Sequence, residues 1–270
     1  MVAAVKATQS GRVEPVSVGV ALLLGLLLVG LVVVMIPRDD DELSPPRGVT
    51  VWAVDASGSQ NLRDAEDVPS LKTLRRTSYA ATLALNAAER GDLLMVNTFA
   101  ATAEEGGAGR AWDLSEKKIG CYTEDDGCRV AREKAADAAA TEIVAFLAAT
   151  QPDGKTDTVA ALYAALDDAR NADVTGSGAN RRVVLESDFV HTSCDELGDD
   201  PRAWTDPEAA AERLTACRGG AVTAIEGADQ VVLRLARASD RWGLNDTQQA
   251  LAVFVAYCEQ HAAPGVCEVE

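Results

Sequence analysis

Three oxygen-bearing side chains lie at alternate positions in the segment Val49–Ser59, which reads VTVWAVDASGS. The β-rich part of this segment ends at Asp55, and Ser57 and Ser59 follow at intervals of two residues. In a tight turn that contains glycine, these alternate side chains can converge on one point. One carboxylate and two hydroxyls suit Mg²⁺, which takes octahedral oxygen ligands and keeps several waters. The segment therefore predicts part of a metal site at the carboxyl end of a central strand, where open α/β sheets bind their ligands.

Two other polar residues are predicted to lie at the same edge of the sheet. Thr156 belongs to the loop sequence Gly-Lys-Thr-Asp-Thr, and Asp188 follows the apolar run 181–187. Because the carboxyl ends of parallel strands share one edge, we expect both residues near Asp55. Each motif alone has a simpler interpretation as a capped turn, a helix N-terminal residue or a loop carboxylate. Their order along the chain favours one joint site for Mg²⁺ or Mn²⁺, since the oxygen set accepts either ion.

Alternating strands and helices are expected to position these residues. Helical patterns alternate with short β-rich runs, which predicts βαβ units and a doubly wound, mostly parallel α/β sheet flanked by helices. The expected strands cover residues 49–54, 93–99, 181–187, 231–235 and 266–269, with an edge strand over Ala111–Ile119. The expected helices cover residues 70–90, 131–150, 159–170, 205–217 and 248–260.

These motifs resemble the metal-ion-dependent adhesion site of the von Willebrand factor A (vWA) domain family, and the resemblance covers about residues 48–270. The family's site is written D-x-S-x-S, followed by a threonine on a later loop and an aspartate after a hydrophobic strand. Residues 55–59 match the first motif in full, and residues 154–158 are similar to the family's G-x-T-x-T segment. Residues 187–189, Ser-Asp-Phe, are similar to its S/T-D-G motif, with phenylalanine where the family usually has glycine.

The resemblance implies a Rossmann-like, vWA-type fold and a role for each site residue. It implies that the hydroxyls of Ser57, Ser59 and Thr156 bind the metal, and that Asp55 and Asp188 act directly or through water. Neutral hydroxyls leave a divalent cation under-neutralised, so a carboxylate from a protein partner can complete the octahedron. We therefore expect a binding module for a protein partner and not an enzyme.

The amino-terminal part of the chain has the composition of a membrane anchor. Residues 16–36 form an uncharged apolar run, long enough to span about 30 Å of hydrocarbon as a helix. A cleaved signal peptide is the alternative, but the run exceeds a typical signal-peptide core and no small-residue cleavage site follows it. Residues 1–15 are a short polar tail and 37–47 an acidic, proline-containing stalk, so the domain covers 48–270. Basic residues on the two sides of the span are nearly balanced and leave its orientation in the bilayer open.

Six cysteines favour an orientation for the predicted membrane span. They fall into three couples that are close in sequence, and the C-x-x-C spacing of many zinc sites is absent. Disulfides are favoured, which places the domain outside the cytoplasm and the N-terminus inside it. Six reduced core thiols are the alternative, and the connectivity stays open among 15 possible pairings. The candidates are Cys121, Cys128, Cys194, Cys217, Cys258 and Cys267.

The charge balance excludes one class of partner. The net charge is −17 and the pI is about 4.5. Binding to phosphates requires clustered Lys and Arg, which this chain lacks, so no nucleic-acid partner is expected.

Two enzymatic interpretations remain as alternatives. Residues 149–156 fit a relaxed P-loop pattern, in which Gly154, Lys155 and Thr156 would bind a nucleotide, but that motif requires a preceding strand and a helix is expected there. A hydrolase would need a base, and His191 and His261 are the two histidines of the chain. Ser57 has no G-x-S-x-G context, so a catalytic triad is the weaker of the two interpretations.

Overall fold

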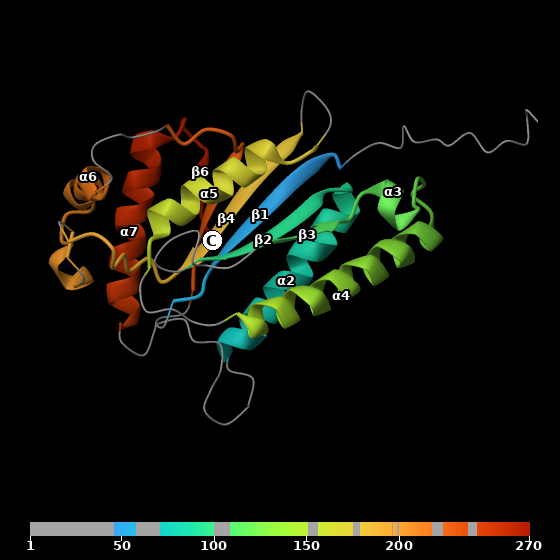
Figure 1. Cartoon of the computed structure of the whole chain (residues 1–270), viewed down its shortest axis with the longest axis horizontal. Coiled ribbons are helices and arrows are strands. Elements are labelled where there is room, and N and C mark those ends of the chain that lie inside the picture. The colour runs from blue at the N-terminus through green and yellow to red at the C-terminus, as the bar shows by residue number, and fades with distance from the viewer. Residues whose placement is uncertain are drawn as a thin grey trace, which may run out of the picture. The chain divides into compact units, whose positions relative to one another are not determined.

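A six-stranded sheet with the order β3-β2-β1-β4-β5-β6 lies at the centre of the domain in the computed structural model (Figure 1). Five strands are parallel, and β3 pairs antiparallel to β2 at one edge. This confirms the predicted mostly parallel α/β sheet. The strands are β1 (Gly48–Asp55), β2 (Leu93–Phe99), β3 (Arg110–Asp113), β4 (Asn180–Ser187), β5 (Gln230–Leu235) and β6 (Cys267–Val269).

The structure describes residues 46–57, 71–99, 109–150, 156–174, 179–195, 197–198, 200–217, 224–236 and 242–270. The predicted tail, the membrane span 16–36 and the stalk up to residue 45 lie outside these ranges, as do Ser59, Gly154 and Lys155. No helix within the described ranges is long and apolar enough to cross a membrane.

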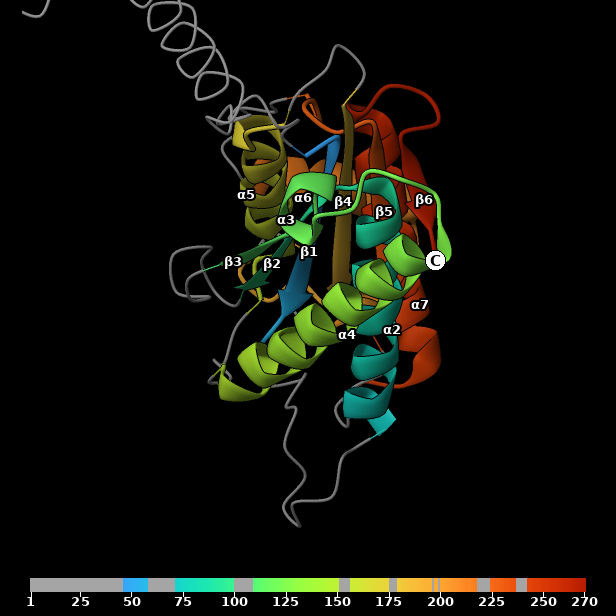
Figure 2. The same ribbon diagram turned by 90° about the vertical axis from the view of Figure 1, so that its right-hand side faces the viewer.

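Helices cover both faces of the sheet (Figure 2). On one face α5 packs against β1 and β4, α7 packs against β5, and α6 packs on α7. On the other face, α2 and α4 pack against each other and on the sheet. The helices are α2 (Leu71–Arg90), α3 (Glu116–Ile119), α4 (Asp126–Ala149), α5 (Thr158–Asn171), α6 (Pro207–Cys217) and α7 (Leu244–His261), with a 3₁₀ turn at Pro201–Ala203.

Alternation along β1 divides its side chains between two hydrophobic cores. Val49, Val51 and Ala53 belong to the core beneath α5 and α7, whereas Trp52 and Val54 belong to the core beneath α2 and α4. Every residue of β1 is buried, because helices cover the strand on both sides. This explains why the segment reads as a continuous apolar run rather than as an alternating one.

The segment that was predicted to be one edge strand, Ala111–Ile119, divides into β3 and the short helix α3. Ser115 caps this helix, since its hydroxyl accepts a hydrogen bond from the Lys118 N–H at 3.4 Å. Gly120 ends the helix in the left-handed conformation, at a φ of 76°. A local cap and a glycine stop therefore override the strand pattern, and the second half of this prediction was wrong.

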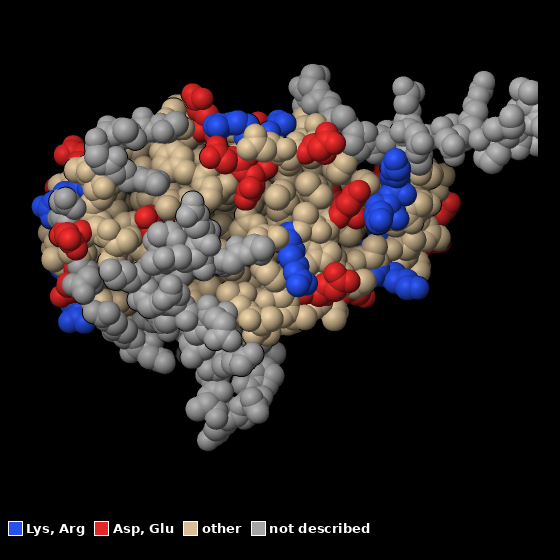
Figure 3. Space-filling view, in the orientation of Figure 1, with Lys and Arg blue, Asp and Glu red and all other residues tan. Residues whose placement is uncertain are grey.

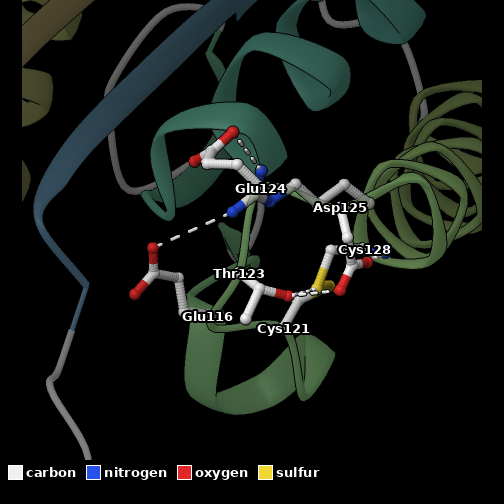
Figure 4. The surroundings of a disulfide bond; sticks show 7 residues. Glu116, Cys121, Thr123, Glu124, Asp125 and Cys128 are labelled. Carbon is white, nitrogen blue, oxygen red and sulfur yellow. Dashed lines mark hydrogen bonds and ion pairs between the residues drawn. A yellow bond between two sulfur atoms is a disulfide. The ribbon is translucent and has the colours of Figure 1, made fainter.

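Helix α4 begins more than one turn before its predicted start at Ala131. Asp125 caps it by accepting hydrogen bonds from the Cys128 N–H and the Thr123 hydroxyl, both at 2.8 Å (Figure 4). The disulfide between Cys121 and Cys128 fixes the chain that enters this cap. The prediction missed the extra turn because its residues are polar and lack helical apolar periodicity.

Helix α7 also begins before its predicted start at Gln248. The Gly243 N–H donates to the Asp246 carboxylate at 3.1 Å, which closes the first turn. The remaining predicted helix and strand ends agree with the structure within two residues.

All six cysteines form disulfides, and each cysteine pairs with its neighbour in sequence. The prediction of disulfides is therefore supported, and the structure selects one of the 15 pairings that the sequence left open. Cys194–Cys217 ties the segment after β4 to the end of α6, and Cys258–Cys267 ties α7 to β6.

Candidate metal site

Two carboxylates lie buried at the point where the strand order of the sheet reverses. Asp55 ends β1 and Asp188 follows β4, and neither side chain is exposed to solvent. Burial and, second, the negative charge of Asp188 raise the pKa of Asp55 from 3.8 to about 6, against hydrogen bonds from Ser187 and Ser57 that lower it. The structure thus brings together two of the predicted site residues, in an arrangement that is electrostatically unfavourable without a cation.

Short hydrogen bonds hold these two carboxylates in place. The Ser57 N–H donates to Oδ1 of Asp55 at 2.8 Å, and the Ser187 hydroxyl donates to Oδ2 at 2.6 Å. The Val190 N–H donates to Oδ1 of Asp188 at 3.1 Å. Each carboxylate is therefore fixed by the turn that follows its own strand, and Ser187 links the ends of β1 and β4. The sequence indicated Ser187 only as part of the Ser-Asp-Phe motif, and its contact with Asp55 was not predicted.

The loop of Thr156 is joined to the segment that follows Asp188. Thr192 makes two bonds to Thr156: its hydroxyl accepts from the Thr156 N–H at 2.9 Å, and its own N–H donates to the Thr156 carbonyl at 3.1 Å. The Ser193 hydroxyl donates to the same carbonyl at 3.0 Å. Thr156 itself is buried. Thr192 and Ser193 were not predicted, although two adjacent hydroxyls shortly after Asp188 were a visible signal.

Phe189 has a positive φ of 59°, and no other residue except glycine does so in the described part of the chain. It occupies the position where the vWA motif usually has glycine, and it adopts the left-handed backbone that glycine tolerates easily. Such a conformation costs a side-chain-bearing residue roughly 1–2 kcal/mol. The ring is buried and packs against Phe254 at 5.3 Å between centroids, which offsets that cost.

A buried arginine from the opposite face of the sheet supports the two strand ends. Arg76 of α2 donates to the Asp55 carbonyl at 3.1 Å and to the Glu186 carboxylate at 2.6 Å. Arg234 of β5 approaches the second oxygen of Glu186 at 3.1 Å. Two guanidinium groups therefore compensate Glu186, so it adds little to the repulsion between Asp55 and Asp188. Nothing local in the sequence indicated this network, because its members come from three separate elements.

The residues in this region fit a hard divalent cation. Within the described ranges, no group of three or more His, Cys, Asp or Glu side chains could hold a metal ion. Such a group would be needed for zinc, whereas Mg²⁺ and Mn²⁺ accept hydroxyls beside carboxylates. The raised pKa of Asp55 supports this fit. Burial and, second, the charge of Asp188 disfavour the ionised carboxylate, and a bound cation would stabilise that ionised form. The individual ligand assignments stay predictions, and Ser59 lies outside the described residues.

Neither enzymatic alternative gains support from the geometry. The element before residues 149–156 is the long helix α4 and not the strand that a P-loop requires. His191 is buried with its Nε2 3.3 Å from the Ser193 hydroxyl, and His261 lies 3.0 Å from the Thr215 hydroxyl. Neither of these contacts involves Ser57, the proposed nucleophile.

No protein-family model and no curated protein matches the sequence. The fold is similar to several solved structures. The manganese-loaded TRAP protein of Plasmodium vivax has a TM-score of 0.38 at 14% identity, over 83% of this chain and 68% of that chain. A von Willebrand factor type A protein from Catenulispora acidiphila has a TM-score of 0.36 at 14% identity, over 83% of this chain and 38% of that chain. The pilus adhesin SpaC of Lactobacillus rhamnosus GG has a TM-score of 0.43 at 14% identity, over 84% of this chain and 28% of that chain. These similarities are distant and do not decide family membership, activity or partners.

Proposed function

We propose that this domain is a binding module that recognises a protein partner through a divalent cation, Mg²⁺ or Mn²⁺, and that it catalyses no reaction. The observation that carries the proposal is the pair of buried carboxylates, Asp55 and Asp188, at the ends of β1 and β4. Buried like charges are costly unless a cation compensates them. Their place at the reversal of strand order is also where open α/β sheets bind ligands.

Five residues would hold the ion in this proposal: Asp55, Ser57, Ser59, Thr156 and Asp188. The cation would supply a Lewis-acidic centre with a position open to a carboxylate of the partner. The role of the chain is to hold the donors. The bond between Ser187 and Asp55 fixes one carboxylate, and the bonds of Thr192 and Ser193 hold the Thr156 loop.

The same proposal includes an anchored, extracytoplasmic domain. Residues 16–36 would span the bilayer with the N-terminus in the cytoplasm. The three disulfides support this orientation, because disulfides persist in oxidising compartments. A membrane-impermeant alkylating reagent applied to a variant with a single added cysteine in the stalk tests it. Labelling in intact cells supports the orientation, and labelling only after lysis contradicts it.

Calorimetric titration of the full-length protein with Mn²⁺ tests the metal site directly. Asp188→Ala and Thr156→Ala should weaken Mn²⁺ binding, and the double variant should lose less than the sum, because residues that share one ion are coupled. Asp195→Ala is the matched control, since Asp195 is an exposed carboxylate in the same connection. Equal Mn²⁺ affinity in all these variants would contradict the site.

Partner capture then tests the function. Pull-down with the wild-type domain in Mg²⁺ and in EDTA, without nucleotide, should recover the partner only in Mg²⁺. Asp188→Ala should recover none, while its circular dichroism stays that of the wild type. Capture that persists in EDTA would contradict recognition through the metal, even if the metal itself binds.

A further inference from the structure

A cavity of about 280 Å³ lies between helix α5 and the strands β2 and β3. Ala53 and Phe99 bring its wall close to the end of β1 that carries Asp55, whereas Asp168 of α5 lines another part of it. Its apolar wall includes Met95, Phe99, Ala161, Ala164 and Ala165, and polar residues line the rest. Arg110 is one of these, and its guanidinium lies over the Phe146 ring of α4, 5.2 Å from the ring centroid. A volume just below the 300–1,000 Å³ of most small-molecule pockets suits one long side chain better than a drug-sized ligand.

One carboxylate, that of Asp168, lines this cavity and forms no ion pair within the described part of the chain. Asp168 is about half buried, and burial raises its pKa, with the neighbouring Asp167 adding to the effect and the Asn97 amide opposing it. Asp167 on the same helix pairs with Arg170 at 3.1 Å, whereas no Lys or Arg of the described ranges forms an ion pair with Asp168. A partly buried carboxylate in that position is stabilised by a cation from outside.

Asn97 holds the carboxylate in a defined orientation. Its side-chain N–H donates to Oδ2 of Asp168. Gly109 makes room for this amide, because a Cβ on Gly109 would lie only 1.9 Å from Oδ1 of Asn97. With one oxygen of Asp168 engaged by Asn97, the carboxylate fits a single ammonium donor better than the two-pronged guanidinium of arginine.

The charge of the surroundings favours a cation. Figure 3 shows acidic side chains on the surface over α5, with Lys and Arg side chains beside them. The chain as a whole carries a net charge of −17, and a net charge of this sign attracts cationic ligands. The apolar walls match the four-carbon stem of lysine, which packs along apolar surface while its charged end finds a polar partner.

We infer that this cavity binds a lysine side chain presented by a partner protein, with the ammonium on Asp168 and the stem against the alanines of α5. Asp168 follows Thr158 by ten positions and therefore lies roughly 15 Å along α5 from its N-terminus, at the far end of the cavity from Ala161. The cavity is a second contact site, beyond the carboxylate-binding metal position proposed above, and it requires no metal.

NMR titration with Nα-acetyl-lysine N-methylamide tests this inference on the full-length protein in EDTA. The probe has no carboxylate, so the proposed metal site cannot contribute. We expect shifts in the Asn97 side-chain amide with lysine, and binding at least tenfold weaker with the norleucine analogue, which has the same length but no ammonium. A wild-type protein that binds neither probe, or both equally, would overturn the inference.

Two variants localise the binding. Asp168→Asn keeps the shape and an acceptor for Asn97, and should weaken lysine binding at least tenfold. Asp167→Asn removes the same charge one residue away, where Arg170 compensates it, and should change the affinity less than twofold. Ala164→Leu fills the cavity without a change of charge and should also abolish binding. Equal losses in Asp167→Asn and Asp168→Asn would mean that the lysine probe senses only the general negative charge of the surface.

Discussion

Replacement of Asp55 by asparagine should stabilise the metal-free protein at neutral pH and abolish its response to Mg²⁺. Asp55 is completely buried and close enough to Asp188 for the two charges to repel each other. Asparagine has nearly the same shape and carries no charge. It therefore removes the repulsion while it keeps an acceptor for the Ser57 N–H.

The magnitude follows from the shift in the Asp55 pKa. The pKa rises from 3.8 to about 6 on folding, and each unit corresponds to about 1.4 kcal/mol, so ionised Asp55 costs the folded state on the order of 3 kcal/mol at pH 7. The hydrogen bonds from Ser187 and Ser57 to the charged carboxylate are already contained in this net shift. We therefore expect Asp55→Asn to raise the free energy of unfolding by about 3 kcal/mol.

The sign of the pH dependence is fixed by the direction of this pKa shift. The pKa of Asp55 in the folded state lies above its unfolded value, so protonated Asp55 favours the folded state over ionised Asp55. This stabilisation is fully present below about pH 3.8 and is lost as the pH rises through about 6, where Asp55 ionises in the folded protein. The gain from Asp55→Asn should therefore appear between these two pH values. It should be absent at pH 3.5, where Asp55 is largely protonated in both states.

Urea unfolding of the full-length protein in EDTA, at pH 3.5 and pH 7, measures this effect. Mg²⁺ at 100 times its dissociation constant should then stabilise the wild type by about 2.7 kcal/mol and leave Asp55→Asn unchanged. Asp137→Asn, at an exposed position on α4, is the control and should change stability by less than about 0.5 kcal/mol. Destabilisation by Asp55→Asn at pH 7, or an equal gain at both pH values, would refute the reasoning.

Three further predictions concern stability and are checked by chemical unfolding. Glu186→Ala should cost about 3–5 kcal/mol, because it leaves the buried charge of Arg76 unpaired. Phe189→Gly should relieve roughly 1–2 kcal/mol of backbone strain but lose about 3–5 kcal/mol of buried ring contacts, so the protein should be destabilised on balance. Replacement of Cys194 and Cys217 by alanine should remove about 3 kcal/mol, since their bridge closes a separation of 23 residues.

Each of these predictions has a matched control. Glu133→Ala breaks the exposed pair with Arg129 and should cost under about 1 kcal/mol. Phe189→Ala loses the ring but keeps the strained backbone, so it should be less stable than Phe189→Gly. Removal of the Cys121–Cys128 bridge, at a separation of 7 residues, should cost about 1 kcal/mol less than removal of the longer one. If a control variant loses more stability than the variant it is paired with, or Phe189→Ala proves more stable than Phe189→Gly, the mechanism given for that pair is contradicted.

The elements that the sequence predicted best are those with strong local signals. The strand Leu93–Phe99 has the predicted bounds, and α2 and α5 differ from prediction by one residue at either end at most. Apolar periodicity and flanking glycine, proline or capping residues determine such elements largely by themselves. The errors occurred where the signal was polar or short, as at Ala111–Ile119 and at the first turn of α4.

The sequence by itself determined which residues carry the candidate chemistry. Asp55 and Ser57 are spaced along one strand end, and Asp188 follows a strongly apolar strand, so both carboxylates could be assigned to one edge of a parallel sheet. The three close cysteine couples were also visible, because disulfide candidates depend on residue type and spacing. These properties are local or follow from the rules of parallel sheets.

Only the tertiary structure decided how these residues are held and what surrounds them. Arg76 supports Asp55 from a helix on the opposite face, and Thr192 holds the loop of Thr156 from 36 residues away. The cavity beside Asp168 exists because α5 packs over β2 next to the edge strand β3. Contacts between distant segments depend on the packing of all the layers, and the burial that shifts the pKa of a carboxylate depends on the same packing. No local sequence pattern encodes these long-range contacts or this burial. The electrostatics around Asp55 and around Asp168 could therefore be determined only from the folded chain.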